Sequence, residues 1–222
     1  QAQVAVRFED RRPVGLSAIA LTLGTHDAPE GETMRERLLA EAVGPALASL
    51  GRSMEPDTRL VIFPSPGAAG PDTHSGLTGR KSADDAYGSF VRRSAPSLSG
   101  KDPSRIDRIA SYAARQAARC VIAAGLAWEC EVQLSYIVGD ETPASVEVDT
   151  YQSGRVADAM ISRRLREIFD FRAGAIAERM GLWDLPRARG GHFYRDLARY
   201  GHMGRDELAP PWEDLSLAGK LA

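Results

Sequence analysis

Residues 76–81 are Gly-Leu-Thr-Gly-Arg-Lys, and residues 99–107 are Ser-Gly-Lys-Asp-Pro-Ser-Arg-Ile-Asp at the start of a long helical pattern. Both glycine-containing turns carry cations, which are Arg80, Lys81, Lys101 and Arg105. Glycine lets backbone N–H groups approach an anion closely, and the amino end of a helix favours phosphate. The two turns therefore predict a polyphosphate site, although neither matches the P-loop pattern.

An ordinary basic loop at the start of a helix is the alternative interpretation. Ser104 is a suitable N-cap residue, and Pro103 lies directly before it. Only the polyphosphate site needs the ammonium group of Lys101, so the two interpretations make different demands on that residue. Both stay open on these residues alone.

Composition limits the class of protein. The chain has 222 residues, of which 43% are hydrophobic and 26% are charged, as in a globular protein with one large or two small domains. Its net charge of −2 gives no general attraction to nucleic acid. Cys120 and Cys130 lack metal-ligand spacing, and we interpret them as buried thiols. With no secretory signal and no run that could span a membrane, we expect a cytoplasmic protein with neither membrane nor nucleic-acid partners.

The first part of the chain predicts a β-β-α-β unit. Apolar residues alternate in residues 3–8 and recur in residues 16–23, which indicates an antiparallel hairpin. Residues 32–50 have helical spacing, with a kink expected at the Gly44-Pro45 pair, and residues 60–63 form a short strand. This unit cannot close a core by itself, so we expect its sheet to pack against another copy or a homologous chain.

The second part adds longer helices and two strands, so the fold class is α+β. The elements expected are helices at 104–124, 157–169 and 176–180 and strands at 130–138 and 145–150. Gly125 should end the first of these helices. Its arginines, Arg108, Arg115 and Arg119, are expected to form a solvated face. His192 and His202 in the aromatic tail are expected to pack rather than to bind a ligand.

Several motifs, in the right order, resemble the C-terminal part of the S-adenosylmethionine synthetase (methionine adenosyltransferase) family. Besides the two turns, they are Ala113-Ala114-Arg115, Ala123-Ala124-Gly125-Leu126-Ala127, Cys130-Glu131-Val132-Gln133-Leu134-Ser135-Tyr136, Phe169-Asp170-Phe171-Arg172 and Tyr200-Gly201-His202-Met203-Gly204-Arg205. The resemblance implies repeated β-α-β units with sheets packed inward and helices outside. It assigns residues 1–66 to part of a middle domain and residues 67–222 to a C-terminal domain.

Family members join ATP to methionine, and the resemblance implies that activity here, with Mg²⁺ and possibly K⁺ as cofactors. It places Arg80, Lys81 and Lys101 on the polyphosphate as catalytic residues. It places His74, Ser97 and Arg105 at the substrates. It makes Asp107 a ligand of the metal.

Some positions depart from the family pattern. His74 stands where the family has an aspartate, and Gln1 stands where it has a phosphate-contacting lysine. Residues 67–70 are shorter than the family segment and lack its aromatic residue, and Ser-Ala-Pro-Ser at 94–97 replaces a glycine-rich loop. The family's upstream His-Pro-Asp-Lys segment, with an essential histidine and a metal aspartate, is absent.

Three functional hypotheses follow. The chain is part of a split or fragmentary synthetase, in a homo-oligomer or in a hetero-oligomer with a chain that carries the missing N-terminal part. Alternatively, it is a divergent nucleotide- or polyphosphate-binding transferase or a triphosphatase. The third possibility is a non-catalytic scaffold or regulatory subunit.

Overall fold

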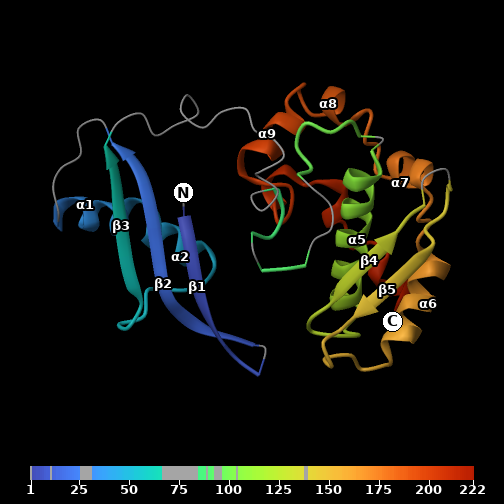
Figure 1. Ribbon diagram of the computed structural model, residues 1–222, viewed down its shortest axis with the longest axis horizontal. Helices are drawn as coiled ribbons and strands as arrows, with labels where there is room; N and C mark the ends of the chain where they lie inside the picture. The colour runs from blue at the N-terminus through green and yellow to red at the C-terminus, as the bar shows by residue number, and fades with distance from the viewer. Residues whose placement is uncertain are drawn as a thin grey trace. The chain divides into compact units, whose positions relative to one another are not determined.

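The computed structural model describes residues 2–10, 12–25, 32–66, 85–88, 90–92, 97–103, 105–137 and 140–222. The chain divides into two compact units, Gln1–Gly76 and Leu77–Ala222. Each unit combines helices with a small sheet (Figure 1), which confirms the α+β class. The expected inward packing of the sheets concerns how units meet and stays a prediction, as does the assignment of domains at residues 66 and 67.

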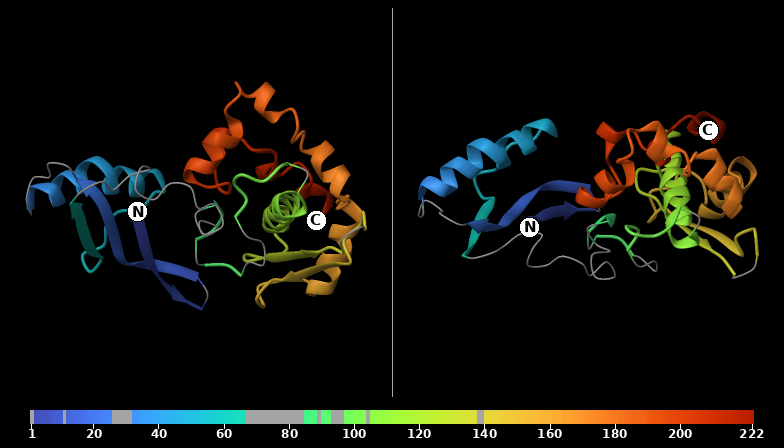
Figure 2. Two further views of the ribbon diagram at one scale, coloured as in Figure 1. Left: turned by 45° about the horizontal axis from the view of Figure 1, so that its top comes forward. Right: turned by 90° about the horizontal axis from the view of Figure 1, so that it is seen from above.

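The first unit is the predicted β-β-α-β arrangement. Strand β1 (Ala2–Glu9) is antiparallel to β2 (Arg12–Thr25), and β3 (Arg59–Pro66) is parallel to β2, so β2 is central. A small core forms where Ile19 and Leu60 on neighbouring strands meet Val43 from the helical segment. That segment covers one face of the sheet (Figure 2).

The helical segment of this unit contains a π-turn. It consists of α1 (Glu32–Leu38), the π-turn η1 (Leu39–Val43) and α2 (Gly44–Ser49). The N–H of Gly44 donates to the carbonyl of Leu39, five residues back, and a Cβ at position 44 would lie 2.7 Å from that oxygen. Glycine is therefore required where the wider turn brings a carbonyl close, and Pro45 can follow because a first-turn N–H needs no helical partner. A π-turn therefore lies directly before the Gly44-Pro45 pair, and the predicted kink at this pair stays a prediction.

The second unit is built around α5 (Ile106–Ala123). On one side lies the antiparallel pair β4 (Glu131–Ser135) and β5 (Ser145–Asp149), followed by α6 (Asp158–Ile168) and α7 (Ala173–Arg179). The segments α8 (Leu185–Ala188), α9 (Phe193–Tyr200) and the short turns η3 (Asp206–Leu208) and η4 (Pro211–Glu213) lie on the other side of α5 (Figure 2). The last turn, η5 (Ala218–Lys220), precedes Leu221, whose carbonyl accepts from Arg164 of α6.

The core of this unit runs along α5. Ile109, Ala113, Ala117 and Val121 are all buried, and they belong to the same cluster as the fully buried Trp212. The helix ends as predicted at Gly125, whose φ is 70°. There the N–H groups of Gly125 and Leu126 donate to the carbonyls of Ile122 and Val121 at 2.9 and 3.2 Å, which is a Schellman motif. None of the described helices is both long and apolar enough to cross a membrane.

The helix α5 begins at Ile106, two residues after the predicted start at residue 104. Arg105 occupies the N-cap position, without a side-chain cap. The expected cap, Ser104, lies outside the described residues. Long-range contacts, described below, hold the segment before the helix.

Candidate functional site

Lys101 and Asp107 meet at the amino end of α5. The ammonium nitrogen of Lys101 lies 2.5 Å from Oδ2 of Asp107, and the two side chains are 21% and 42% exposed. Lys101 closes a four-residue turn in which its N–H donates to the carbonyl of Leu98 at 3.3 Å. Gly100, the third residue of this turn, has a φ of 80°, where glycine is favoured. Two of the predicted site residues therefore lie together at a solvent-accessible helix end.

Of the other predicted site residues, the structure describes only Ser97 and Arg105. Arg105 is exposed at the N-cap of α5, and its N–H donates to the carbonyl of Asp102 at 3.0 Å. Ser97 is buried, directly before the turn that carries Lys101. His74, Arg80 and Lys81 lie outside the described residues, so their convergence with Lys101 stays a prediction.

Asp85 holds the amino-terminal end of the turn that carries Lys101. One of its carboxylate oxygens accepts the backbone N–H groups of Leu98 and Ser99 at 2.6 and 2.8 Å, and the other accepts the Ser99 hydroxyl at 2.6 Å. The Asp85 carbonyl also accepts the N–H of His202 at 2.7 Å. A buried carboxylate thus ties this turn to the C-terminal tail.

Behind the turn, polar side chains continue into the core. His202, which is fully buried, lies 2.9 Å through Nε2 from the hydroxyl of Ser99 and 2.6 Å through Nδ1 from that of Tyr112. The phenol of Tyr112 accepts from Nε of Arg108 at 2.9 Å, and Arg108 also donates to the carbonyl of Lys101. Burial raises the pKa of Tyr112 and lowers that of His202 to about 4, so both groups are uncharged at neutral pH.

Aromatic packing encloses this polar chain. The ring of Trp212 stacks on Tyr112 with centroids 3.6 Å apart, and its indole N–H donates to the carbonyl of His202 at 2.7 Å. The guanidinium of Arg108 lies 4.2 Å from the ring centroid of Tyr194. These rings exclude water, and exclusion strengthens the hydrogen bonds they cover.

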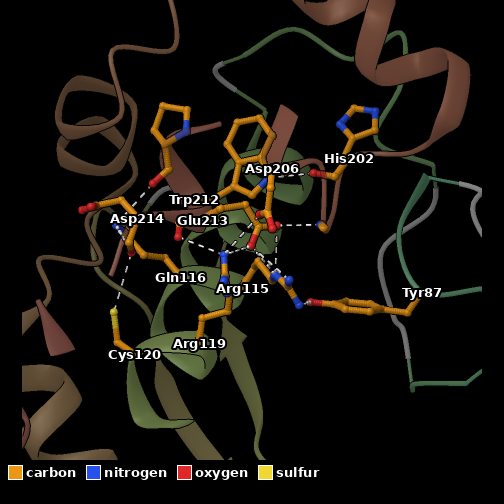
Figure 3. Close-up of polar contacts among 12 residues, drawn as sticks. Tyr87, Arg115, Gln116, Arg119, Cys120, His202, Asp206, Trp212, Glu213 and Asp214 are labelled. Atoms are coloured by element: carbon orange, nitrogen blue, oxygen red, sulfur yellow. Dashed lines mark hydrogen bonds and ion pairs between the residues drawn. The ribbon is translucent and has the colours of Figure 1, made fainter. Parts of the chain in front are cut away.

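A second polar cluster lies further along α5 (Figure 3). Glu213, whose side chain is 5% exposed, accepts from Arg115 at 3.0–3.1 Å, from Arg119, and from the N–H of Gly204 at 2.7 Å. The hydroxyl of Tyr87 also accepts from Arg115, at 3.1 Å. The prediction of a solvated arginine face was therefore wrong. Arg108 is buried, while Arg115 and Arg119 bind a carboxylate from the tail.

We next considered which residues could hold a metal. The described ranges contain no group of three or more His, Cys, Asp or Glu residues suited to a metal ion. Mg²⁺, however, needs only one or two carboxylates when phosphate oxygens and water complete its shell. Asp107 is half-exposed and offers one such carboxylate. Both cysteines are free thiols, and burial raises the pKa of Cys130 to about 12, which disfavours the thiolate that metals bind.

Sequence reasoning missed the anchoring residues. Asp85 and Glu213 stand in none of the motifs, and Ser99 stands in the 99–107 motif without an assigned role. Tyr112, however, lies four residues after Arg108, and Arg115 and Arg119 follow at seven and eleven, so all four share one face of α5. An aromatic residue within an arginine stripe is a signal that the stripe is covered.

Comparisons with known proteins agree over most of the chain. A family model described as S-adenosylmethionine synthetase, C-terminal domain, matches residues 68–214. The S-adenosylmethionine synthase of Parasynechococcus marenigrum is 40% identical over 227 residues, which cover 97% of this chain and 54% of the relative. That of Trichormus variabilis is 40% identical over 223 residues, covering 96% of this chain and 53% of the relative.

A solved structure gives the same result. An unusual S-adenosylmethionine synthetase from Campylobacter jejuni matches with a TM-score of 0.83 and 28% sequence identity. The match covers 99% of this chain and 58% of the other. The chain thus spans about half the length of the curated relatives it matches.

Proposed function

The chain belongs to the S-adenosylmethionine synthetase family, and on this premise we propose that it forms part of a methionine adenosyltransferase, with the Lys101 turn at the triphosphate of ATP. The observation that carries the proposal is the Lys101–Asp107 pair at the amino end of α5. A cation for phosphate and a carboxylate for a metal stand side by side, where the helix dipole also favours an anion.

The leaving group of the reaction, the triphosphate, is the group whose negative charge must be stabilised. The methionine sulfur attacks the 5′ carbon of ATP, a C–S bond forms, and the C–O bond to the triphosphate breaks, so that the bonding electrons leave with the triphosphate. Negative charge grows on that bridging oxygen in the transition state. A cation that binds the charged form more tightly than the ground state lowers the barrier, and Lys101 has this role in the proposal.

Asp107 and Lys101 have different roles in this proposal. Asp107 would hold Mg²⁺ together with phosphate oxygens, and the ion supplies charge neutralisation when bound. Before ATP binds, Asp107 pairs with Lys101 and keeps its ammonium group oriented at the helix end. Arg80 and Lys81 complete the cationic side of the site in this proposal, and His74, Ser97 and Arg105 contact the substrates.

In this proposal, residues outside the given sequence complete the site. Relatives are about twice as long as this chain, so residues that match their other half are needed for the complete reaction. We propose that the segment or partner chain that carries the missing N-terminal part supplies them. The substrates are then ATP and methionine, with Mg²⁺ and possibly K⁺ as cofactors.

The test is to titrate inorganic triphosphate, with Mg²⁺, into the 222-residue chain together with any co-purifying partner. Lys101→Ala removes one charge-assisted contact worth about 1.5–3 kcal/mol, so affinity should fall roughly tenfold to a hundredfold. Lys220→Ala is the matched control, because Lys220 is exposed on η5 and has no role in the site. An unchanged dissociation constant for Lys101→Ala would falsify the triphosphate site.

A divergent nucleotide-binding transferase or triphosphatase is the second candidate. His74 favours it, because a histidine there removes the negative charge that would pair with an amino group of methionine. Incubation of the complete assembly with ATP and methionine separates the two functions. S-adenosylmethionine formation supports the first, whereas phosphate release that is independent of methionine supports the second.

A further inference from the structure

We propose that His202 is a positioning residue of the triphosphate site, because it closes a directed chain of hydrogen bonds that holds both ends of the turn carrying Lys101. The inference rests on the proposed function for the identity of the anion. The hydrogen-bonded chain itself is a property of the second unit and can be tested without any ligand.

The direction of the chain follows from its donors. The Arg108 guanidinium can only donate, so Tyr112 accepts at its hydroxyl oxygen and uses its proton toward Nδ1 of His202. Nδ1 is then an acceptor, and the single proton of the neutral ring is on Nε2. That proton is donated to the hydroxyl of Ser99, whose own proton goes to Asp85. Each group between the two charged ends donates once and accepts once along the chain.

The groups at both ends of this hydrogen-bonded series, Asp85 and Arg108, hold residues 98–101. At one end, Asp85 accepts the N–H groups of Leu98 and Ser99. At the other end, Arg108 donates to the carbonyl of Lys101. His202 joins the two ends, and Gly100 supplies the positive φ between them. The backbone on both sides of Gly100 is thus fixed by charged groups that are connected through one imidazole.

An imidazole suits this position because it is rigid and carries a donor and an acceptor on opposite sides. Asn can reproduce only the Nδ1 contact and Gln only the Nε2 contact, so neither replaces both. The ring is fully buried, and burial keeps it neutral by lowering its pKa. A charged imidazole would donate from both nitrogens and would oppose the proton of Tyr112.

Positioning matters because an ammonium group contributes through its distance to the anion. A displacement of the turn by 1 Å weakens a charge-assisted contact even when the fold is intact. Loss of the hydrogen-bonded series should therefore lower triphosphate affinity more than loss of a buried hydroxyl elsewhere in the unit does. This difference separates a positioning role from a purely structural one.

The experiment compares Ser99→Ala with Ser162→Ala in the 222-residue chain. Each variant deletes one hydroxyl of the second unit, partly buried at Ser99 and buried at Ser162, and Ser162 donates to the carbonyl of Val146, outside the site. By calorimetry with inorganic triphosphate and Mg²⁺, Ser99→Ala should bind fivefold to twentyfold more weakly, and Ser162→Ala should bind like the parent. Equal affinities in the two variants would overturn the proposal.

Two ligand-free measurements keep the proposal testable if triphosphate does not bind the parent chain, and the first of them also serves if Ser99→Ala does not fold. Nitrogen NMR of labelled histidine, assigned with His202→Gln, should show a neutral ring protonated on Nε2 at pH 7. Amide exchange in residues 98–101 should accelerate at least tenfold in Ser99→Ala and remain unchanged in Ser162→Ala. If triphosphate does not bind and the ring is in the Nε2–H form, the triphosphate site is rejected and the series of hydrogen bonds is retained. A ring that is protonated on Nδ1 or charged would reject the series of hydrogen bonds.

Discussion

At the scale of single residues, the buried imidazole of His202 makes the second unit sensitive to acid. Burial lowers its pKa from 6.5 to about 4, the nearby Asp85 opposes this shift, and Arg108 and Arg205 add to it. The unfolded chain therefore binds a proton below pH 6.5 that the folded chain does not bind until about pH 4. Stability from this group is fully present above pH 6.5 and is lost as the pH falls toward 4.

The expected loss is about 3 kcal/mol at most, since each unit of pKa difference corresponds to about 1.4 kcal/mol. His202→Gln should be less stable than the parent at pH 7.5 but should lose less stability between pH 7 and pH 5. Urea unfolding followed by tryptophan fluorescence measures this, because Trp128, Trp183 and Trp212 all lie in the second unit. Parallel losses in both proteins would show that another group causes the acid sensitivity.

At the scale of the elements, the π-turn between α1 and α2 reverses the usual effect of replacing a helical glycine. Gly→Ala in a helix normally stabilises by about 1 kcal/mol. At Gly44 the added Cβ would meet the carbonyl oxygen of Leu39 at 2.7 Å, a backbone atom that cannot turn aside. Gly44→Ala should therefore destabilise the first unit by about 1–3 kcal/mol.

Gly174 provides the matched comparison, because it lies in α7 and a Cβ there meets nothing within 4 Å. Gly174→Ala should stabilise its own unit by about 0.5–1 kcal/mol. Hydrogen exchange in the peptides around each site measures both effects. Slower exchange in residues 39–49 of Gly44→Ala would contradict the steric argument.

Local patterns predicted the elements well and predicted their partners poorly. The hairpin and the end of α5 at Gly125 follow from signals within a few residues. The ion pairs of Arg115 and Arg119 on α5 do not, because their carboxylate is on Glu213, 98 and 94 positions further along the chain. The motif resemblance indicated Lys101 and Asp107 as site residues. His202 was expected only to pack, because the residues near it in the sequence give no signal that Ser99 and Tyr112 are its partners.

At the scale of the whole molecule, the first unit presents exposed apolar side chains on its first strand. On β1, Val4 and Val6 are 56% and 40% exposed. Apolar groups gathered in this way mark an interaction surface. We therefore expect the sheet to pack against a second copy or a homologous chain.

Sedimentation at micromolar concentration tests this expectation. Val6→Glu should weaken association at least tenfold, because it would bury an unpaired charge. Leu50→Glu is the control, since Leu50 is 75% exposed in the turn after α2 and away from the strands. A parent chain that stays monomeric without a partner would contradict the expectation.

The contact between His202 and Ser99, which are 103 positions apart, also has a consequence for the order in which the protein is made. During synthesis, Lys101 and Asp107 leave the ribosome long before the tail that fixes their turn. The helix end can form early, but its cationic turn acquires its fixed shape only after residue 202 and the ring of Trp212 arrive. A nick between residues 190 and 202 could therefore disable the turn without altering any residue in it.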